Sequence, residues 1–118
     1  FNSFTMNGTP LNGKLTLGEN IADLCGLLVS HDALQLHYAS IQDEVDQTQS
    51  DKEFLLSYAR IWRNNIRPEA VDMQIQVDPH PPAHWRINGT LSHFPLFHQV
   101  FKTQSGDKMF CDDYIDIW

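Results

Sequence analysis

The sequence predicts a mainly helical fold with at most one or two short strands. Across residues 19–40, apolar side chains recur at intervals of three and four, which is the spacing of one helix face. Residues 51–64 carry the clearest amphipathic stripe in the chain. Prolines at four positions between 68 and 82 divide the chain that follows into short pieces. We therefore expect several helices and little sheet.

The chain should begin with an irregular segment and continue as a helical part over 19–118. Residues 1–18 contain two Asn-Gly pairs, which are typical of turns, and one short extended piece is expected at 14–17. The first helix should run from residue 19 to about residue 40. The polar stretch that follows it, 42–50, has the composition of a solvated loop.

A second helix is expected at 51–64. Ser50 stands three residues before Glu53, which is the spacing of a capping box and places the start of the helix at residue 51. One apolar stripe runs along this helix, and as a bare pattern it indicates core packing. Its members are Phe54, Leu55, Tyr58, Ala59 and Trp62.

The second half of the chain should hold two shorter helices. Pro68 suits the first turn of a helix over 69–77, and the three prolines after it impose an extended segment. The pair Asn88-Gly89 predicts a turn. A helix over 93–102 should follow. The alternating apolar residues of 115–118 predict a strand-like strap.

Size and composition narrow the classes of function. The 118 residues make one small domain or a part of a larger one. A part would keep an exposed apolar face able to drive self-association, and the face expected to be exposed is the one that bears Glu19, Asp23 and Trp62. The net charge of −7 and the scattered basic residues argue against a nucleic-acid partner. No apolar run approaches the ~20 residues that cross a bilayer. Cys25 is expected in the core, and Cys111 is the only other cysteine.

Two carboxylates mark the start of the first helix. Glu19 and Asp23 are four residues apart, so both lie on one helix face and repel each other mildly unless a cation stands beside them. A Glu at such a position is able to ligate zinc, while an Asp one turn away hydrogen-bonds a histidine ligand. From the spacing alone, a helix start that favours acidic residues is the more frequent explanation.

A second candidate segment holds a histidine and an arginine. His80 lies among prolines, and this stiffening would let it donate a hydrogen bond to an oxyanion at little entropic cost. Arg86 follows six residues later, and its planar fork is able to bind a peptide carbonyl or a carboxylate. A surface histidine and a structural ion pair are the ordinary alternatives.

Residues 15–23, Leu-Thr-Leu-Gly-Glu-Asn-Ile-Ala-Asp, closely resemble a signature of the neprilysin and endothelin-converting-enzyme family of zinc metalloendopeptidases. The resemblance implies the helical C-terminal portion of a thermolysin-like (zincin) catalytic domain. It implies that Glu19 is the third protein ligand to Zn²⁺. It also implies that Asp23 orients one of the two ligand histidines.

The resemblance extends over nearly the whole chain. The stretch 78–89 resembles the family pattern D-x-H-x-P…F-R-x-x-G, with tryptophan in place of phenylalanine. It implies that His80 stabilises the tetrahedral intermediate and that Arg86 binds the substrate backbone. Ile61 and Trp62 would line the pocket for the side chain after the scissile bond. The other five histidines match no functional position and are expected to be structural or on the surface.

The residues near the end of the chain bear on which organisms the protein comes from. Two cysteines of the animal enzymes have no counterpart near residues 102–103 or 114–116, which favours a bacterial member. The final tryptophan resembles the natural C-terminus of the family. Its members also favour an extracytoplasmic location, periplasmic, cell-surface or secreted.

The motif HExxH, which would supply two histidine ligands and a general base, does not occur in the chain. We therefore expect the remainder of a parent catalytic domain to carry it, and the 118 residues alone to be inactive and not to bind Zn²⁺ tightly. The leading hypothesis is a zinc endopeptidase that cleaves oligopeptides. The alternatives are a non-catalytic peptide-binding relative and a plain helical interaction module.

Overall fold

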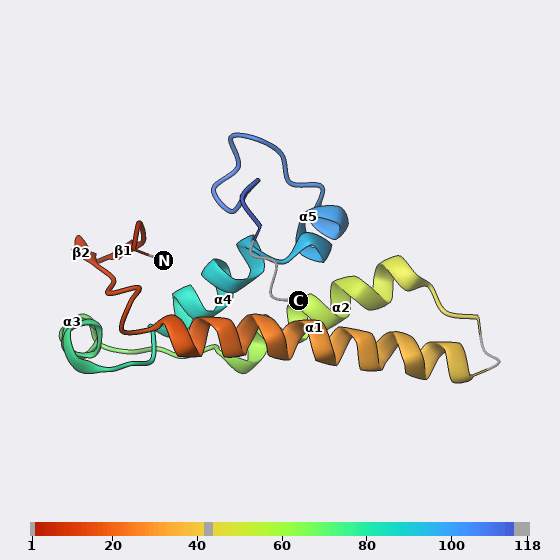
Figure 1. Ribbon diagram of the computed structural model, residues 1–118, viewed down its shortest axis with the longest axis horizontal. Coiled ribbons are helices and arrows are strands. Elements are labelled where there is room, and N and C mark those ends of the chain that lie inside the picture. Colours follow the sequence, from red (N-terminus) through yellow and green to blue (C-terminus); the bar gives the residue numbers. More distant parts are fainter. Residues whose placement is uncertain (1, 42–43, 115–118) are drawn as a thin grey trace.

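The structure, a computed structural model, describes residues 2–41 and 44–114. It contains five helices and one two-stranded hairpin, which confirms the prediction of a mainly helical fold. The molecule is elongated, 50 × 27 × 27 Å, and helix α1 (Leu17–Ser40) lies along its longest axis (Figure 1). The predicted strap at 115–118 lies outside the described residues.

Helix α1 begins two residues earlier than predicted. The backbone amide of Asn20 donates to the carbonyl of Thr16 at 3.1 Å, and the Asn20 side chain donates to the Thr16 hydroxyl at 3.0 Å. Both residues are buried, so these bonds fix the first turn where the lead-in meets the helix. The turn that carries Glu19 is therefore firmly held.

Helix α2 (Gln47–Ile61) starts four residues before the predicted first helical residue, 51. Asp46 is the N-cap residue, and its carboxylate accepts a hydrogen bond from the Gln49 amide at 3.0 Å. Ser50 instead donates its hydroxyl to Tyr38 of α1 at 2.6 Å. The capping-box prediction was wrong because an acidic residue closer to the loop captures the free amides first.

The lead-in is more regular than predicted. Strands β1 (Thr5–Met6) and β2 (Thr9–Pro10) form a hairpin whose turn uses positive φ at Asn7 and Gly8. The extended piece predicted at 14–17 is wrong. That stretch turns into α1 because the Asn12 side chain accepts from the backbone amide of Leu15 at 3.0 Å.

The second half contains helices α3 (Pro68–Val77), α4 (Ala83–Ser92) and α5 (Pro95–Phe101). The turn predicted at Asn88-Gly89 is wrong, because both residues lie inside α4. Residues 89–92 are all buried, so tertiary packing of the helix outweighs the local turn preference of the pair. Pro82, directly before α4, ends the extended segment as expected.

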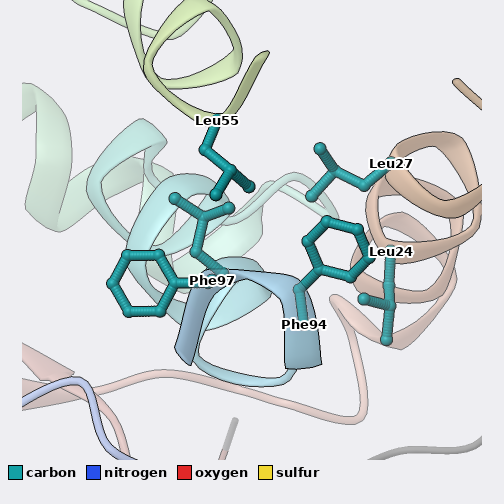
Figure 2. Packing of buried hydrophobic residues seen from close by; sticks show 6 residues of the cluster. Leu24, Leu27, Leu55, Phe94 and Phe97 are labelled. Atoms are coloured by element: carbon teal, nitrogen blue, oxygen red, sulfur yellow. The ribbon is translucent and has the colours of Figure 1, made fainter. Parts of the chain in front are cut away.

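The hydrophobic core joins α1, α2, α4 and α5. Figure 2 shows Leu24 and Leu27 of α1 facing Phe94. Leu55 contributes from α2 and is 1% exposed, the most buried of the core residues. The full set is Leu24, Leu27, Leu55, Leu91, Phe94 and Phe97. This core holds the first half of α1 against α4, the two helices on which the polar site is built.

The carboxylate face of α1 is less exposed than predicted. The Asp23 side chain is only 8% exposed and Trp62 is half-buried, because the Arg86 side chain covers both. Apolar surface does remain open elsewhere on α1, at Leu17 and Val29 among others. Self-association through such surface stays a prediction.

The core position of Leu55 gives a test of the fold. Replacing Leu55 with alanine should lower the free energy of unfolding by about 2–5 kcal/mol, because a buried cavity replaces packed methyl groups. Leu36→Ala is the matched control, since Leu36 is 73% exposed, and it should change stability by less than about 0.5 kcal/mol. Urea denaturation followed by circular dichroism measures both. Equal losses would contradict this packing.

Candidate active site

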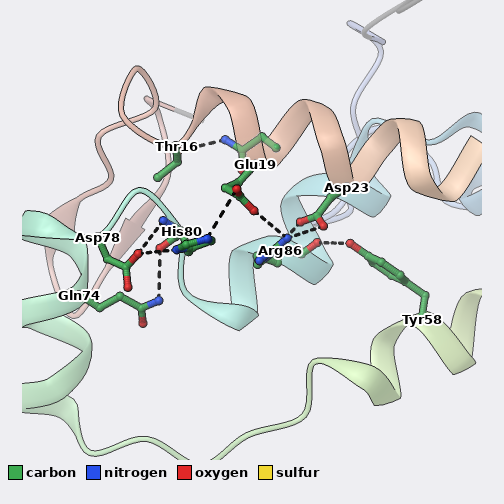
Figure 3. Close-up of polar contacts among 9 residues, drawn as sticks. Thr16, Glu19, Asp23, Tyr58, Gln74, Asp78, His80 and Arg86 are labelled. Atoms are coloured by element: carbon green, nitrogen blue, oxygen red, sulfur yellow. Dashed lines mark hydrogen bonds and ion pairs between the residues drawn. The ribbon is translucent and has the colours of Figure 1, made fainter.

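Residues from four segments of the chain meet at one end of α1, and Figure 3 shows those of α1, of α4 and of the link between α3 and α4. Glu19 and Asp23 project from the first turns of α1, and Arg86 approaches them from α4. His80 comes from the link between α3 and α4. Trp62, the C-cap residue of α2, lies under Arg86. The sequence motifs thus form one cluster.

The strongest contact in the cluster is a forked ion pair. Arg86 donates from Nε to Asp23 Oδ2 and from Nη2 to Asp23 Oδ1, both at 2.7 Å. The two side chains are only 13% and 8% exposed. The hydrogen bonds to Asp23 raise the pKa of Arg86 above its ordinary value, so the guanidinium stays charged. It joins α1 to α4 across 63 residues of sequence.

Glu19 stands between two cationic or polar partners. Its Oε2 lies 3.2 Å from Nη2 of Arg86, and its Oε1 lies 3.6 Å from Nε2 of His80. The Glu19 side chain is 35% exposed, so part of the carboxylate faces open space. The repulsion expected between Glu19 and Asp23 is relieved by Arg86, the protein's own cation.

His80 is oriented by a neighbour that the sequence interpretation missed. Asp78 Oδ1 accepts from the His80 backbone amide at 2.9 Å and from ring Nδ1 at 2.7 Å. Both hydrogen bonds lower the pKa of Asp78, and the bond from the His80 backbone amide has the larger effect. With Nδ1 directed at Asp78, Nε2 points toward Glu19. The sequence Asp-Pro-His could have predicted this contact, because an Asp side chain often accepts a hydrogen bond from the backbone amide two residues further along the chain.

Tyr58 is the other contributor that sequence interpretation did not assign. The Tyr58 hydroxyl donates to the backbone carbonyl of Arg86 at 2.9 Å. Burial, with a smaller contribution from the charge of Asp23, raises the pKa of Tyr58 to about 12. The Arg86 guanidinium carbon lies 3.9 Å from the centre of the Trp62 ring. Tyr58 was noticed only as a member of the packing stripe.

Ile61 lies at the edge of this cluster and is 73% exposed. It lines a cavity of about 360 Å³ between α1 and α2, together with Gly26, Phe54 and Tyr58. Asp23 also lines this cavity. The apolar wall therefore begins directly beside the ion pair.

Among these side chains, Glu19 is suited to be one ligand of a metal site. Zinc takes at least three protein ligands, and within residues 2–41 and 44–114 no three His, Cys, Asp or Glu side chains gather closely enough to hold a metal. Glu19 supplies a partly open carboxylate, a suitable oxygen ligand. His31 and His98, by contrast, bond to Asp51 and to the Ser92 carbonyl inside the fold.

Two carboxylates one helical turn apart thus face an arginine and a proline-flanked histidine in this cluster. The family model for peptidase family M13 matches residues 1–117. The chain therefore belongs to peptidase family M13 and corresponds to its C-terminal region.

Related proteins agree with this membership. The chain is 32% identical to Neprilysin-3 of Drosophila melanogaster and 32% identical to endothelin-converting enzyme 1 of Mus musculus. It is 37% identical to the neutral endopeptidase of Lactobacillus helveticus. Each match covers 100% of this chain but only 16–17% of the relative. These relatives include animal and bacterial proteins, so a bacterial source stays a prediction.

No helix in the described part of the chain is both long enough and apolar enough to cross a membrane.

The ion pair gives the first test of the site. Asp23→Asn should lower the free energy of unfolding by about 3 kcal/mol, because it removes the charge that accepts both 2.7 Å bonds from the largely buried Arg86 and leaves only Glu19 at 3.2 Å. Glu53→Gln is the control, since it removes the exposed ion pair with Arg60 and should cost less than about 1 kcal/mol. Urea denaturation of both variants at neutral pH measures the difference. A loss at Asp23 no larger than at Glu53 would contradict the arrangement.

The pKa of Tyr58 predicts a dependence on alkaline pH. The unfolded chain releases this proton near the ordinary tyrosine pKa of 10.0, whereas the folded chain holds it up to about pH 12. The unfolded state thus binds fewer protons in this interval, so the free energy of unfolding should fall as the pH rises from 10 toward 12. Tyr58→Phe should reduce that fall relative to the unsubstituted chain. Urea denaturation at several pH values in this range measures it, and identical slopes would refute the assignment.

Proposed function

We propose that the chain forms the C-terminal part of the active site of a zinc endopeptidase that hydrolyses oligopeptides. The observation that carries the proposal is the meeting of Glu19, Asp23, His80 and Arg86 at the end of α1. Chance motifs spread over 68 residues, from 19 to 86, have no reason to meet at one place. Membership of peptidase family M13 supports the same chemistry.

Glu19 is proposed as a ligand to the zinc ion. Bound zinc supplies the Lewis acid that polarises the scissile carbonyl and activates water. The carboxylate suits this role because it is held on a firm helix turn and stays 35% exposed. The remaining ligands would come from the HExxH motif in the rest of the parent catalytic domain.

Asp23 is proposed to position two groups. Its forked bonds fix Arg86, and each of its oxygens retains a lone pair for a further donor. A histidine ligand from the parent domain would donate to one of these oxygens and be oriented by it. A carboxylate that is 8% exposed and already hydrogen-bonded is a rigid anchor for such a ligand.

His80 and Arg86 are proposed to bind the substrate. Asp78 accepts from Nδ1 of His80 and so turns Nε2 toward Glu19. The imidazolium form of His80, which carries a proton on both nitrogens, would donate from Nε2 to the developing oxyanion. Among the described residues none bonds Nη1 of Arg86, so this nitrogen is available to a peptide carbonyl. Ile61 and Trp62 would form an apolar wall for the substrate side chain.

The proposal also covers the activity of the chain alone and the location of the whole enzyme. The chain alone is inactive, because one carboxylate does not complete a catalytic zinc site. The whole enzyme works outside the cytoplasm. A non-catalytic peptide-binding relative is the alternative, and an upstream sequence without HExxH would favour it over the enzyme.

A zinc titration tests the proposed ligand. Calorimetry on the 118-residue chain should show weak binding at most, and a chain extended upstream through the HExxH helix should bind zinc tightly and cleave a test peptide. In the extended chain, Glu19→Gln should weaken zinc binding by about 100-fold or more, since a direct ligand is lost. Glu53→Gln, on an exposed pair of α2, should leave zinc binding unchanged. Tight binding by the short chain alone would overturn this ligand set.

A further inference from the structure

We infer that Tyr58 is a positioning residue for the substrate-binding arginine. Its hydroxyl fixes the place along α4 from which the Arg86 side chain departs, and so sets where the guanidinium meets a peptide carbonyl. The inference rests on the proposed function of Arg86 as a substrate-binding residue.

The first support is the choice of acceptor. The Tyr58 hydroxyl donates to the backbone carbonyl of Arg86 itself, at 2.9 Å. This bond joins α2 to α4 across 28 residues of sequence. A hydrogen bond at the backbone of a functional residue restrains the origin of its side chain, which matters because a displacement of about 1 Å costs much of the benefit of orientation.

The second support is the arrangement around the guanidinium. Asp23 holds its Nε and Nη2 edge at 2.7 Å, and the Trp62 ring lies against its face at 3.9 Å. Trp62 stands one helical turn after Tyr58, at the end of α2. A change in how α2 sits on α4 would therefore move both the backbone and the stacking partner of Arg86.

The third support is the state of the hydroxyl. Tyr58 stays protonated at neutral pH because burial and the Asp23 charge raise its pKa to about 12, so it remains a hydrogen-bond donor. The side chains of Thr90 and Trp62 approach the same hydroxyl and oppose that shift. Tyr58 also lines the cavity beside Ile61, where the substrate side chain is proposed to lie.

A double-mutant cycle in the full-length peptidase that carries this region tests the inference. Tyr58→Phe keeps the ring and removes only the hydroxyl, so KM for a test peptide should rise about two- to tenfold with kcat nearly unchanged, as expected for one neutral hydrogen bond. In an Arg86→Ala background, the same change should have no further effect on kcat/KM, because Tyr58 acts through Arg86.

The control is Tyr38→Phe. Tyr38 lies on the far half of α1, and its hydroxyl is hydrogen-bonded to Ser50 of α2. This substitution should leave KM and kcat unchanged in both backgrounds. Zinc content and thermal unfolding, measured on every variant, report whether a loss is one of folding.

The outcomes separate this inference from the function on which it rests. An equal loss of kcat/KM for Tyr58→Phe in both backgrounds, or a lowered melting temperature with unchanged KM, would reduce Tyr58 to a structural role and overturn the inference alone. If Arg86→Ala left kcat/KM unchanged, the substrate-binding role of Arg86 would fall, and the inference with it.

Discussion

The forked ion pair between Asp23 and Arg86 is the interaction on which the site depends. It is the shortest connection between α1 and α4 at this end of the molecule, and both side chains are largely buried. Removing Arg86 would leave the Asp23 charge uncompensated in a region of low dielectric, and removing Asp23 would leave Arg86 with only its weaker contact to Glu19. Glu19 contacts the same guanidinium and His80 contacts Glu19, so both side chains lie beside the pair. The polar side chains thus contact one another in series, and the Asp23–Arg86 pair is the fixed contact among them.

The core and the ion pair divide the task of holding the helices. Leu24 and Leu27 face the aromatic residues of α5 and the linking segment, and they set the distance between helices without specifying a rotation. Asp23, adjacent to Leu24, faces α4 from the neighbouring side of the same helix turn. A directional fork with two 2.7 Å bonds supplies the rotation that apolar packing leaves open. Function-bearing residues are therefore placed by polar geometry on an apolar support.

Sequence periodicity predicted α1 and α2 because each long helix must bury one stripe, and burial leaves a repeating pattern. It did not predict α4. It failed where a contact from elsewhere decided the outcome. Asn88-Gly89 favours a turn locally, yet packing of the residues after it keeps α4 helical. Glu19, Asp23, His80 and Arg86 were found as motifs, but their meeting depends on how α4 crosses α1, which no local pattern contains. The role of Tyr58 was not predicted, because a tyrosine within an apolar helix stripe is indistinguishable in sequence from a residue of the hydrophobic core.

Asymmetry in the contacts of Arg86 bears on how the site would accept a metal. Arg86 lies 2.7 Å from both oxygens of Asp23 but 3.2 Å from one oxygen of Glu19. Its place is therefore set by Asp23, with further restraint from the Trp62 ring. If Glu19 turns toward zinc, Arg86 loses its weaker partner and keeps the stronger one. The zinc-ligand role proposed for Glu19 and the substrate-binding role proposed for Arg86 would thus fall on residues that touch without depending on each other, because Asp23 fixes Arg86 independently of Glu19.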